Sequence, residues 1–171
     1  MKIAIVSDTH NNWNNFKKAI EWIKKEKIQM ILHCGDICSQ EIVDDSKKLF
    51  GGEIKFVKGN GDYDLDLPEK MELEFELESP STSSGRLSLK VAFTHFPDIA
   101  KKMAQQQDPS RASGQAFDLV FYGHTHRPWD EKINNCHMIN PGELAGQFYK
   151  STFAIYDTST ESLELKILEQ L

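Results

Sequence analysis

In the first third of the chain, short continuous runs of hydrophobic residues alternate with segments that have helical spacing. Short apolar runs at 2–7, 28–34 and 53–57 have the composition of buried parallel strands. Between the first two runs, apolar residues recur at the three- and four-residue spacing of an amphipathic helix: Trp13, Phe16, Ala19, Ile20 and Ile23. A second helix is expected at about 40–50. This β-α-β-α-β order predicts an α/β protein with a parallel sheet.

The second half of the chain has a different pattern. Residues 71–78 alternate apolar and acidic side chains, which predicts a half-buried strand with one face in water. The polar segment 79–85 predicts a loop, and 86–94 predicts the returning strand. A helix is expected near 97–107, followed by strands at 118–123, 137–140, 151–157 and 162–168. Without an internal repeat or a clear linker, we expect a single domain over 1–171 with no cap domain.

Composition and charge narrow the function classes. Of the 171 residues, 39% are hydrophobic and 27% are charged, which is ordinary for a globular protein with one full core. No apolar run approaches the roughly 20 residues of a membrane span, and the N-terminus lacks signal-peptide features, so a cytoplasmic protein without membrane association is expected. The net charge of −6 argues against a stable nucleic-acid partner. Such a protein can still handle phosphate if metal ions supply positive charge.

The cysteines and one aspartate-rich segment have simple interpretations. The three cysteines, Cys34, Cys38 and Cys136, lack the spacing of a disulfide framework and are expected to be reduced structural thiols. The aspartates at 62, 64 and 66 suggest a calcium loop. That interpretation fails, because Leu67 and Leu73 stand where an EF-hand needs Gly and Glu.

Polar side chains follow the apolar runs at the points where the predicted strands end. Five runs lead into seven residues of metal-binding type: Asp8, His10, Asp36, Asn60, His95, His124 and His126. Sites in open α/β sheets are built at the carboxyl ends of the strands. The glycines at 35, 59 and 123 each precede one of these residues and permit a sharp turn or a close backbone approach.

The chemistry of this set is that of a metal centre. Imidazole and carboxylate ligands together suit first-row divalent ions such as manganese, iron, nickel or zinc. Seven side chains are too many for one four-coordinate ion, but they fit two ions that share a bridging carboxylate. Each fragment alone has a simpler interpretation. Asp-x-His can cap a helix, His-Thr-His can form a polar turn, and His33 can be an ordinary core residue. Their joint occurrence at five strand ends favours the metal centre.

The segments SDTH, GD, GNGD, TH, GHTH and NPG, in this order, resemble those of the calcineurin-like metallophosphoesterases. The short chain and the GN-x-D form resemble their small phosphodiesterase branch of the YfcE type. The resemblance extends from Met1 to Gly142. It implies an α/β fold of four layers, α/β/β/α, in which two facing mixed sheets are flanked by helices and a dinuclear centre lies at one end.

The resemblance also implies roles for the matching residues. Asp8, His10 and His126 would bind one ion. Asn60, His95 and His124 would bind the other, and Asp36 would bridge both. Asp36, Asn60 and His95 are the expected catalytic residues of this set. The implied activity is hydrolysis of a small phosphate-ester or nucleotide-like substrate, most simply a phosphodiester, by in-line attack of a hydroxide that bridges two ions; Mn²⁺ is expected, with Ni²⁺, Fe²⁺ or Zn²⁺ as alternatives.

Two departures from the family pattern affect catalysis and specificity. Gly61 stands where larger members carry a histidine that assists the leaving group, so modest rates and a preference for leaving groups of low pKa are expected. Asp62 and His137 are candidate substitutes, although a loop-capping role is favoured for Asp62. Phe96 stands where the family usually has glycine; it either packs locally or stacks on a ring of the substrate. Arg127 either pairs with a substrate phosphate or is an exposed loop charge.

Several alternatives remain open at this point. The fold also suits a non-catalytic metal-binding scaffold or a nucleotide-binding regulator, although retention of all the ligand positions favours an enzyme. The aromatic residues Trp13, Trp129, Phe148 and Tyr149 are candidates for a homo-oligomer interface, with core packing as the default. The segment 140–142, Asn-Pro-Gly, is expected to shape loops near the site without binding metal.

Overall fold

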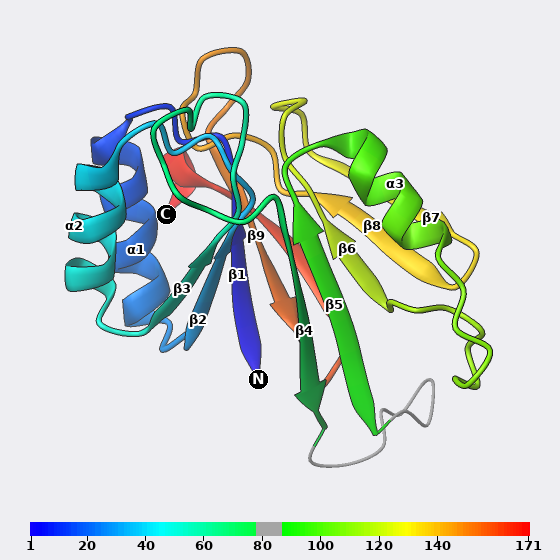
Figure 1. Cartoon of the computed structure of the whole chain (residues 1–171). Coiled ribbons are helices and arrows are strands. Elements are labelled where there is room, and N and C mark those ends of the chain that lie inside the picture. Colours follow the sequence, from blue (N-terminus) through cyan, green and yellow to red (C-terminus); the bar gives the residue numbers. More distant parts are fainter. Residues whose placement is uncertain (78–86) are drawn as a thin grey trace.

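The computed structural model describes residues 1–77 and 87–171, whose strands form two five-stranded sheets (Figure 1). The first sheet has the order β10-β9-β1-β2-β3. Its parallel strands are β1 (Lys2–Val6), β2 (Met30–His33) and β3 (Glu53–Phe56), and its antiparallel additions are β9 (Thr152–Asp157) and β10 (Ser162–Ile167). The predicted loop at 79–85 lies outside the described residues.

The second sheet has the order β4-β5-β6-β8-β7. Its strands are β4 (Lys70–Glu76), β5 (Ser88–Thr94), β6 (Leu119–Phe121), β7 (Trp129–Ile133) and β8 (Cys136–Asn140). Strands β5, β6 and β8 run parallel, whereas β4 and β7 are antiparallel edges. Both sheets are therefore mixed, as expected.

Helices cover the outer face of each sheet. Figure 1 shows α1 (Trp13–Lys25) and α2 (Gln40–Phe50) on the first sheet and α3 (Pro97–Gln105) on the second. The helix α1 begins where the Asn12 side chain accepts a hydrogen bond from the backbone N–H of Asn15, 3.1 Å away. A short 3₁₀ turn, η1 (Leu168–Gln170), follows β10. In the described part of the chain, no helix has the length and apolar character that a membrane crossing requires.

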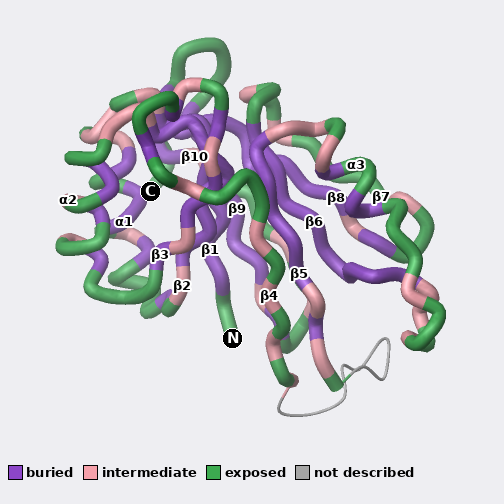
Figure 2. The backbone as a smooth tube through the Cα atoms, viewed as in Figure 1, coloured by how far each residue is buried: buried purple, intermediate pink, exposed green. Residues whose placement is uncertain are grey.

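Buried residues are concentrated in the strands (Figure 2). Alternation along the strands divides the apolar residues into three layers. In β1, Ile3 and Ile5 point between the sheets, whereas Ala4 and Val6 point towards α1 and α2. A third layer lies beneath α3 and includes Val120. Helix, sheet, sheet and helix thus form the expected α/β/β/α order.

The two edge strands of the second sheet differ in how well their sequences predict them. In β4, Met71, Leu73 and Phe75 are half-buried while the intervening charged residues are exposed, so the period-two prediction is confirmed. The strand β7 was not predicted. Four of its five residues are exposed, and its sequence WDEKI has no apolar period. Charged side chains on such an edge oppose pairing with another chain.

The parallel strands deliver their following loops to one end of the molecule. The chain leaves β1, β2 and β3 of the first sheet, and β5 and β6 of the second, at the top of Figure 1. The residues after these strands come from positions as distant as Asp8 and His126, yet they meet there. This end of the sandwich is where the predicted ligands lie.

Candidate metal centre

The loops at this end have an unusual backbone conformation. Five of the seven predicted ligands have positive φ angles: Asp8 at 52°, His10 at 43°, Asp36 at 58°, His124 at 70° and His126 at 59°. Residues other than glycine rarely adopt this region, and such strain concentrates at functional sites. Backbone hydrogen bonds between the loops hold it: the N–H of Asp8 donates to the carbonyl of Gly35, and that of His10 to the carbonyl of Asp36, at 3.0 and 2.9 Å.

Close packing between the loops explains the glycine before His124. A Cβ atom on Gly123 would lie 2.0 Å from the Ser7 Oγ atom and 2.8 Å from an Asp8 carboxylate oxygen. Its backbone carbonyl also accepts a hydrogen bond from the Asn140 side chain, 2.8 Å away. The Asn140-Pro141-Gly142 segment thus holds the loop that carries His124 through this hydrogen bond, in agreement with its predicted role in shaping loops near the site.

One cluster contains Asp8, His10 and His126. The Nε2 atoms of the two histidines lie 3.2 Å apart, and their rings are stacked. An Asp8 carboxylate oxygen lies 3.5 Å from Nε2 of His126 and 3.8 Å from Nε2 of His10. The three possible ligand atoms all lie within 4.8 Å of one another, so one metal ion could bind all of them.

A second cluster contains Asn60, His95 and His124. The side-chain oxygen of Asn60 lies 2.8 Å from Nδ1 of His124 and 3.0 Å from Nε2 of His95. These two imidazole nitrogens are 3.2 Å apart. The amide oxygen of Asn60 therefore faces both imidazoles, so this residue offers more than a turn-forming backbone.

The carboxylate of Asp36 lies between the clusters. Its Oδ2 atom is 3.5 Å from Nε2 of His10 in one cluster and 3.6 Å from Nε2 of His95 in the other. Its Oδ1 atom accepts a hydrogen bond from the N–H of Gly61 at 2.6 Å, which orients the group. The structure thus brings all seven predicted residues together, with the shared aspartate at the centre.

Buried hydrogen-bond partners orient the histidines. The Nδ1 of His95 donates to the carbonyl of Cys34, and that of His126 donates to the Glu143 carboxylate, both at 2.8 Å. Each bond leaves Nε2 turned towards the clusters, an arrangement common among metal-binding histidines. Glu143 was missed by the sequence analysis. Its position directly after the Asn-Pro-Gly segment was the only signal, because its role depends on a contact with a distant loop.

The carboxylate of Asp62 is fully engaged by backbone donors. It is 1% exposed and accepts hydrogen bonds from the N–H groups of Asp36, Gly59 and Cys38 at 2.7–2.8 Å. Asp62 therefore caps the two loops, as favoured, and does not point at a substrate. The other candidate acid, His137, pairs with Leu119 at the amino end of β6 and contacts Asp130, whereas the clusters follow the carboxyl end of β6.

Burial sets the protonation of the cluster. It raises the pKa of Asp8 to about 7 and lowers the pKa values of His10 and His95. Burial opposes ionisation of Glu143 too, but hydrogen bonds from His126 and three loop amides hold the pKa of that carboxyl below its ordinary value. Neutral imidazoles and convergent carboxylates fit a divalent cation, which would replace the proton on Asp8.

Aromatic and basic side chains surround the clusters. The Phe96 ring lies 5.0 Å from the His95 ring and 5.4 Å from that of His124, between centroids. Arg127 is exposed, and its guanidinium lies over the Trp129 ring. The default of core packing is wrong for Trp129, Phe148 and Tyr149, which are 46%, 71% and 52% exposed. Trp13 is partly buried and packs against the core beneath α1.

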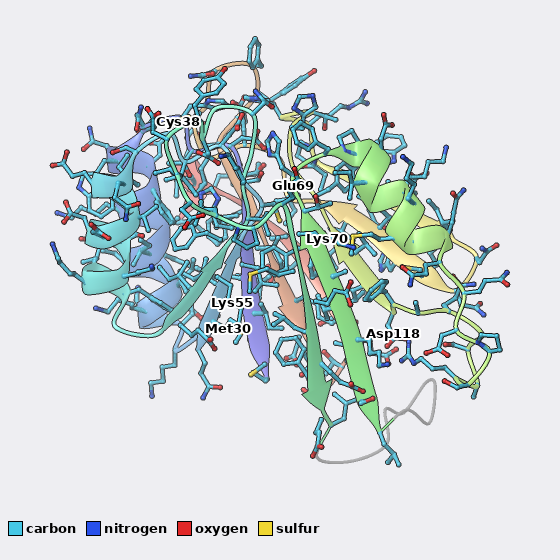
Figure 3. All side chains as sticks on the ribbon, in the orientation of Figure 1. Met30, Cys38, Lys55, Glu69, Lys70 and Asp118 are labelled. Carbon is cyan, nitrogen blue, oxygen red and sulfur yellow. The ribbon has the colours of Figure 1, made fainter. Side chains whose placement is uncertain are left out.

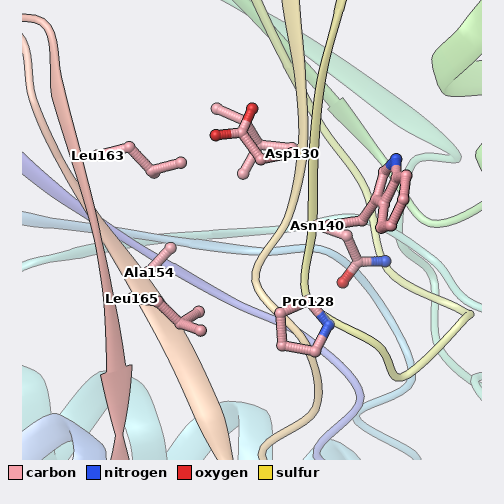
Figure 4. Close-up of a pocket in the computed structure, with 8 residues that line it drawn as sticks. Pro128, Asp130, Asn140, Ala154, Leu163 and Leu165 are labelled. Carbon is pink, nitrogen blue, oxygen red and sulfur yellow. The ribbon is translucent and has the colours of Figure 1, made fainter.

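A pocket of about 290 Å³ lies between the open edges of the two sheets (Figure 4). Asp130 and Asn140 from the second sheet, with Pro128 just before β7, face Ala154, Leu163 and Leu165 from the first. The lining is largely apolar and includes none of the seven clustered residues. This pocket is therefore distinct from the candidate metal centre.

Comparisons with known proteins agree with this geometry. Residues 1–161 match the family model of the calcineurin-like phosphoesterase superfamily domain. Phosphodiesterase MJ0936 of Methanocaldococcus jannaschii is 28% identical over 99% of this chain and 100% of its own length. The structure of an archaeal phosphodiesterase superposes with a TM-score of 0.77 at 26% identity, covering 98% of this chain and 99% of that one.

A more distant structure shares the fold. YfcE, a phosphoesterase from E. coli, superposes with a TM-score of 0.64 at 16% identity, covering 98% of this chain and 100% of its own. The family match covers most of the chain, and the relatives align over nearly their full lengths. The chain therefore belongs to the calcineurin-like phosphoesterase superfamily, whose enzymes hydrolyse phosphoric esters.

Proposed function

We propose that this protein is a metal-dependent phosphodiesterase with two divalent ions at the candidate centre. Asp8, His10 and His126 would hold one ion, Asn60, His95 and His124 the other, and Asp36 both. The position of Asp36 carries this proposal, because one of its oxygens lies 3.5 and 3.6 Å from a histidine of each cluster. Manganese is the ion we propose first, since the mixed imidazole and oxygen ligands accept it.

The charge of the ligand set favours an anionic substrate. Of the seven residues, only Asp8 and Asp36 carry a negative charge when ionised. Two divalent ions would therefore leave the centre with a net positive charge, to which a phosphodiester is attracted. When bound, such ions supply a nucleophile by lowering the pKa of a water molecule and stabilise charge on the attacking and leaving oxygens. The neutral amide of Asn60 adds an oxygen ligand without reducing that positive charge.

Among the residues that the structure describes, neither position 61 nor position 62 provides a general acid for the leaving group. Gly61 has no side chain, and the Asp62 carboxylate is engaged by three backbone N–H groups. As the bond from phosphorus to the leaving oxygen breaks, that oxygen keeps the electron pair and takes its proton from water. Leaving groups of low pKa should therefore react fastest. The Phe96 ring, beside His95 and His124, is placed to contact one ester group.

Hydrolysis by metal-stripped protein, titrated with Mn²⁺, tests this function directly. We expect bis-p-nitrophenyl phosphate to be hydrolysed in preference to p-nitrophenyl phosphate. Asp36→Asn should lose at least one bound ion and at least about 100-fold in rate, because it removes the shared charge. Elemental analysis measures the bound metal, and Asp64→Asn on an exposed position is the matched control. Full metal content and rate in Asp36→Asn would contradict the bridging role.

The same titration separates the alternatives. Two bound ions without turnover of any ester would refute the phosphodiesterase. Tight binding of a nucleotide in that case would indicate a regulator, and its absence a scaffold.

Substitution of Glu143 tests the orientation of His126. Glu143→Gln keeps the size of the side chain but removes the charge that fixes the imidazole, so affinity for the ion at this cluster should fall by about 10–100-fold. Calorimetric titration with Mn²⁺ measures the change. Glu131→Gln, on an exposed residue of β7, is the control and should bind like the parent protein. Equal affinities for the two variants would show that Glu143 does not orient the ligand.

Metal uptake should release a proton from Asp8. Because burial raises its pKa to about 7, Asp8 is largely protonated at about pH 6, and an incoming ion must displace that proton. Burial lowers the pKa values of His10 and His95, so a proton competes with the metal less strongly there than at an ordinary histidine. Metal affinity should therefore fall as the pH decreases below about 7. Calorimetry in two buffers of different ionisation enthalpy counts the released protons, and pH-independent affinity between about pH 6 and 8 would contradict this.

Restoring an acid at position 61 requires a second change. A Cβ atom on Gly61 would lie 2.7 Å from Sγ of Cys38, so the thiol occupies the space that a side chain at 61 needs. Figure 3 shows Cys38 at the end of the sandwich where these loops meet. Cys38 also has a φ of 71°, which glycine adopts without strain.

We therefore expect the double variant Gly61→His with Cys38→Gly to depend less on leaving-group pKa than the parent protein. The reason is that general acid catalysis supplies about 10²–10⁴-fold where the leaving group is poor. Rates for a series of aryl diesters give the slope. Cys38→Gly alone is the control and should keep the parent slope. An unchanged slope in the double variant, with metal content retained, would show that position 61 does not face the leaving oxygen.

A further inference from the structure

A pocket of about 360 Å³ lies beside the His126 loop, within the size range of small-molecule sites. Its lining combines two tyrosines and one tryptophan with one threonine and one arginine: Tyr122, Tyr149, Trp129, Thr125 and Arg127. Thr125 and Arg127 flank His126 in the sequence, so the pocket adjoins the cluster of Asp8, His10 and His126. The aromatic pocket, as we call these five residues, is not needed to bind the metal.

The aromatic pocket and the metal centre are held by the same buried group. One oxygen of Glu143 accepts from His126, and the other accepts from the backbone N–H groups of Phe148 and Tyr149 at 2.7 and 2.6 Å. Glu143 is itself fully buried. A single carboxylate thus fixes both a metal ligand and the loop that forms one wall of the pocket. A ligand that contacts both the metal centre and the aromatic pocket would therefore bind to a preformed site.

The pocket lining fits an aromatic ring attached to an anion. Trp129 and Tyr149 expose 46% and 52% of their surface, which gives a ring two faces to contact. The Arg127 guanidinium lies 5.4 Å from the centroid of the Trp129 ring, so the pocket contains a cation next to an aromatic ring. An aliphatic ester group would gain less from this lining, because stacking on Trp and Tyr needs a π face.

We propose that the aromatic pocket binds the aryl or nucleobase ring of the ester group that stays on the phosphate. This deepens the proposed function, on which it rests, by naming the substrate class: phosphodiesters with an aromatic retained group. Arg127 then lies near the phosphate charge, and Trp129 and Tyr149 contact the ring.

Two diesters with the same leaving group test the proposal. The p-nitrophenyl ester of thymidine 5′-phosphate carries a base, whereas methyl p-nitrophenyl phosphate does not. Trp129→Ala and Tyr149→Ala should each raise KM for the thymidine ester by about tenfold, within the range of base–aromatic stacking. KM for the methyl ester should change by less than about twofold. Trp129→Phe keeps a ring and should recover most of the loss, and Leu87→Ala, an exposed apolar residue before β5, is the control.

Equal losses for both esters, or none for either, would overturn the aromatic pocket while the phosphodiesterase stands. A binding measurement tests the aromatic pocket in the case that no diester is hydrolysed. Thymidine 5′-monophosphate should quench the tryptophan fluorescence of the Mn²⁺-loaded protein, and Trp129→Phe should abolish the quench. This result supports the pocket even if no diester is hydrolysed, whereas an unchanged quench in Trp129→Phe refutes it.

Discussion

The convergence of two histidine clusters on the Asp36 carboxylate is the constraint on which the architecture of this end of the molecule depends. His10 comes from a loop of the first sheet and His95 from a loop of the second, yet each places an imidazole nitrogen within 3.6 Å of the same oxygen. The sheets must therefore face each other in a fixed register. Their shared apolar layer, which includes Leu32 and Phe93, provides that register.

Two other buried carboxylates stabilise the loops without belonging to the clusters. Asp62 accepts backbone hydrogen bonds from both loops that carry Asp36 and Asn60, which offsets strain such as the positive φ of Asp36. Glu143 performs the same task for His126 and for the loop of Phe148 and Tyr149. Removal of the Asp62 carboxylate would leave the buried N–H groups of Asp36 and Gly59 without an acceptor, at a cost of about 1–3 kcal/mol for each. The conformation of these loops and the orientation of the candidate ligands thus depend on the same carboxylates.

The sequence predicts the fold and the proximity of the seven candidate ligands well, because both depend on local patterns. Periods of two and three to four residues mark β4 and α1, and the ligand residues follow strands whose parallel order brings their ends together. The strand β7 escaped prediction, because an exposed edge strand has no apolar period. Glu143 and the aromatic pocket also escaped, since both depend on contacts between loops that are distant in sequence. The exposure of Trp129, Phe148 and Tyr149 runs against residue-type preference and becomes visible only in three dimensions.

Anomalous diffraction from crystals grown with Mn²⁺ would show how many ions this protein binds and which residues hold them. We predict two manganese peaks per chain, about 3.5–4 Å apart, with the Asp36 carboxylate between them. One peak should have His10 and His126 as neighbours, and the other His95 and His124. A single peak, or two peaks that do not share Asp36, would contradict the dinuclear centre and the function built on it.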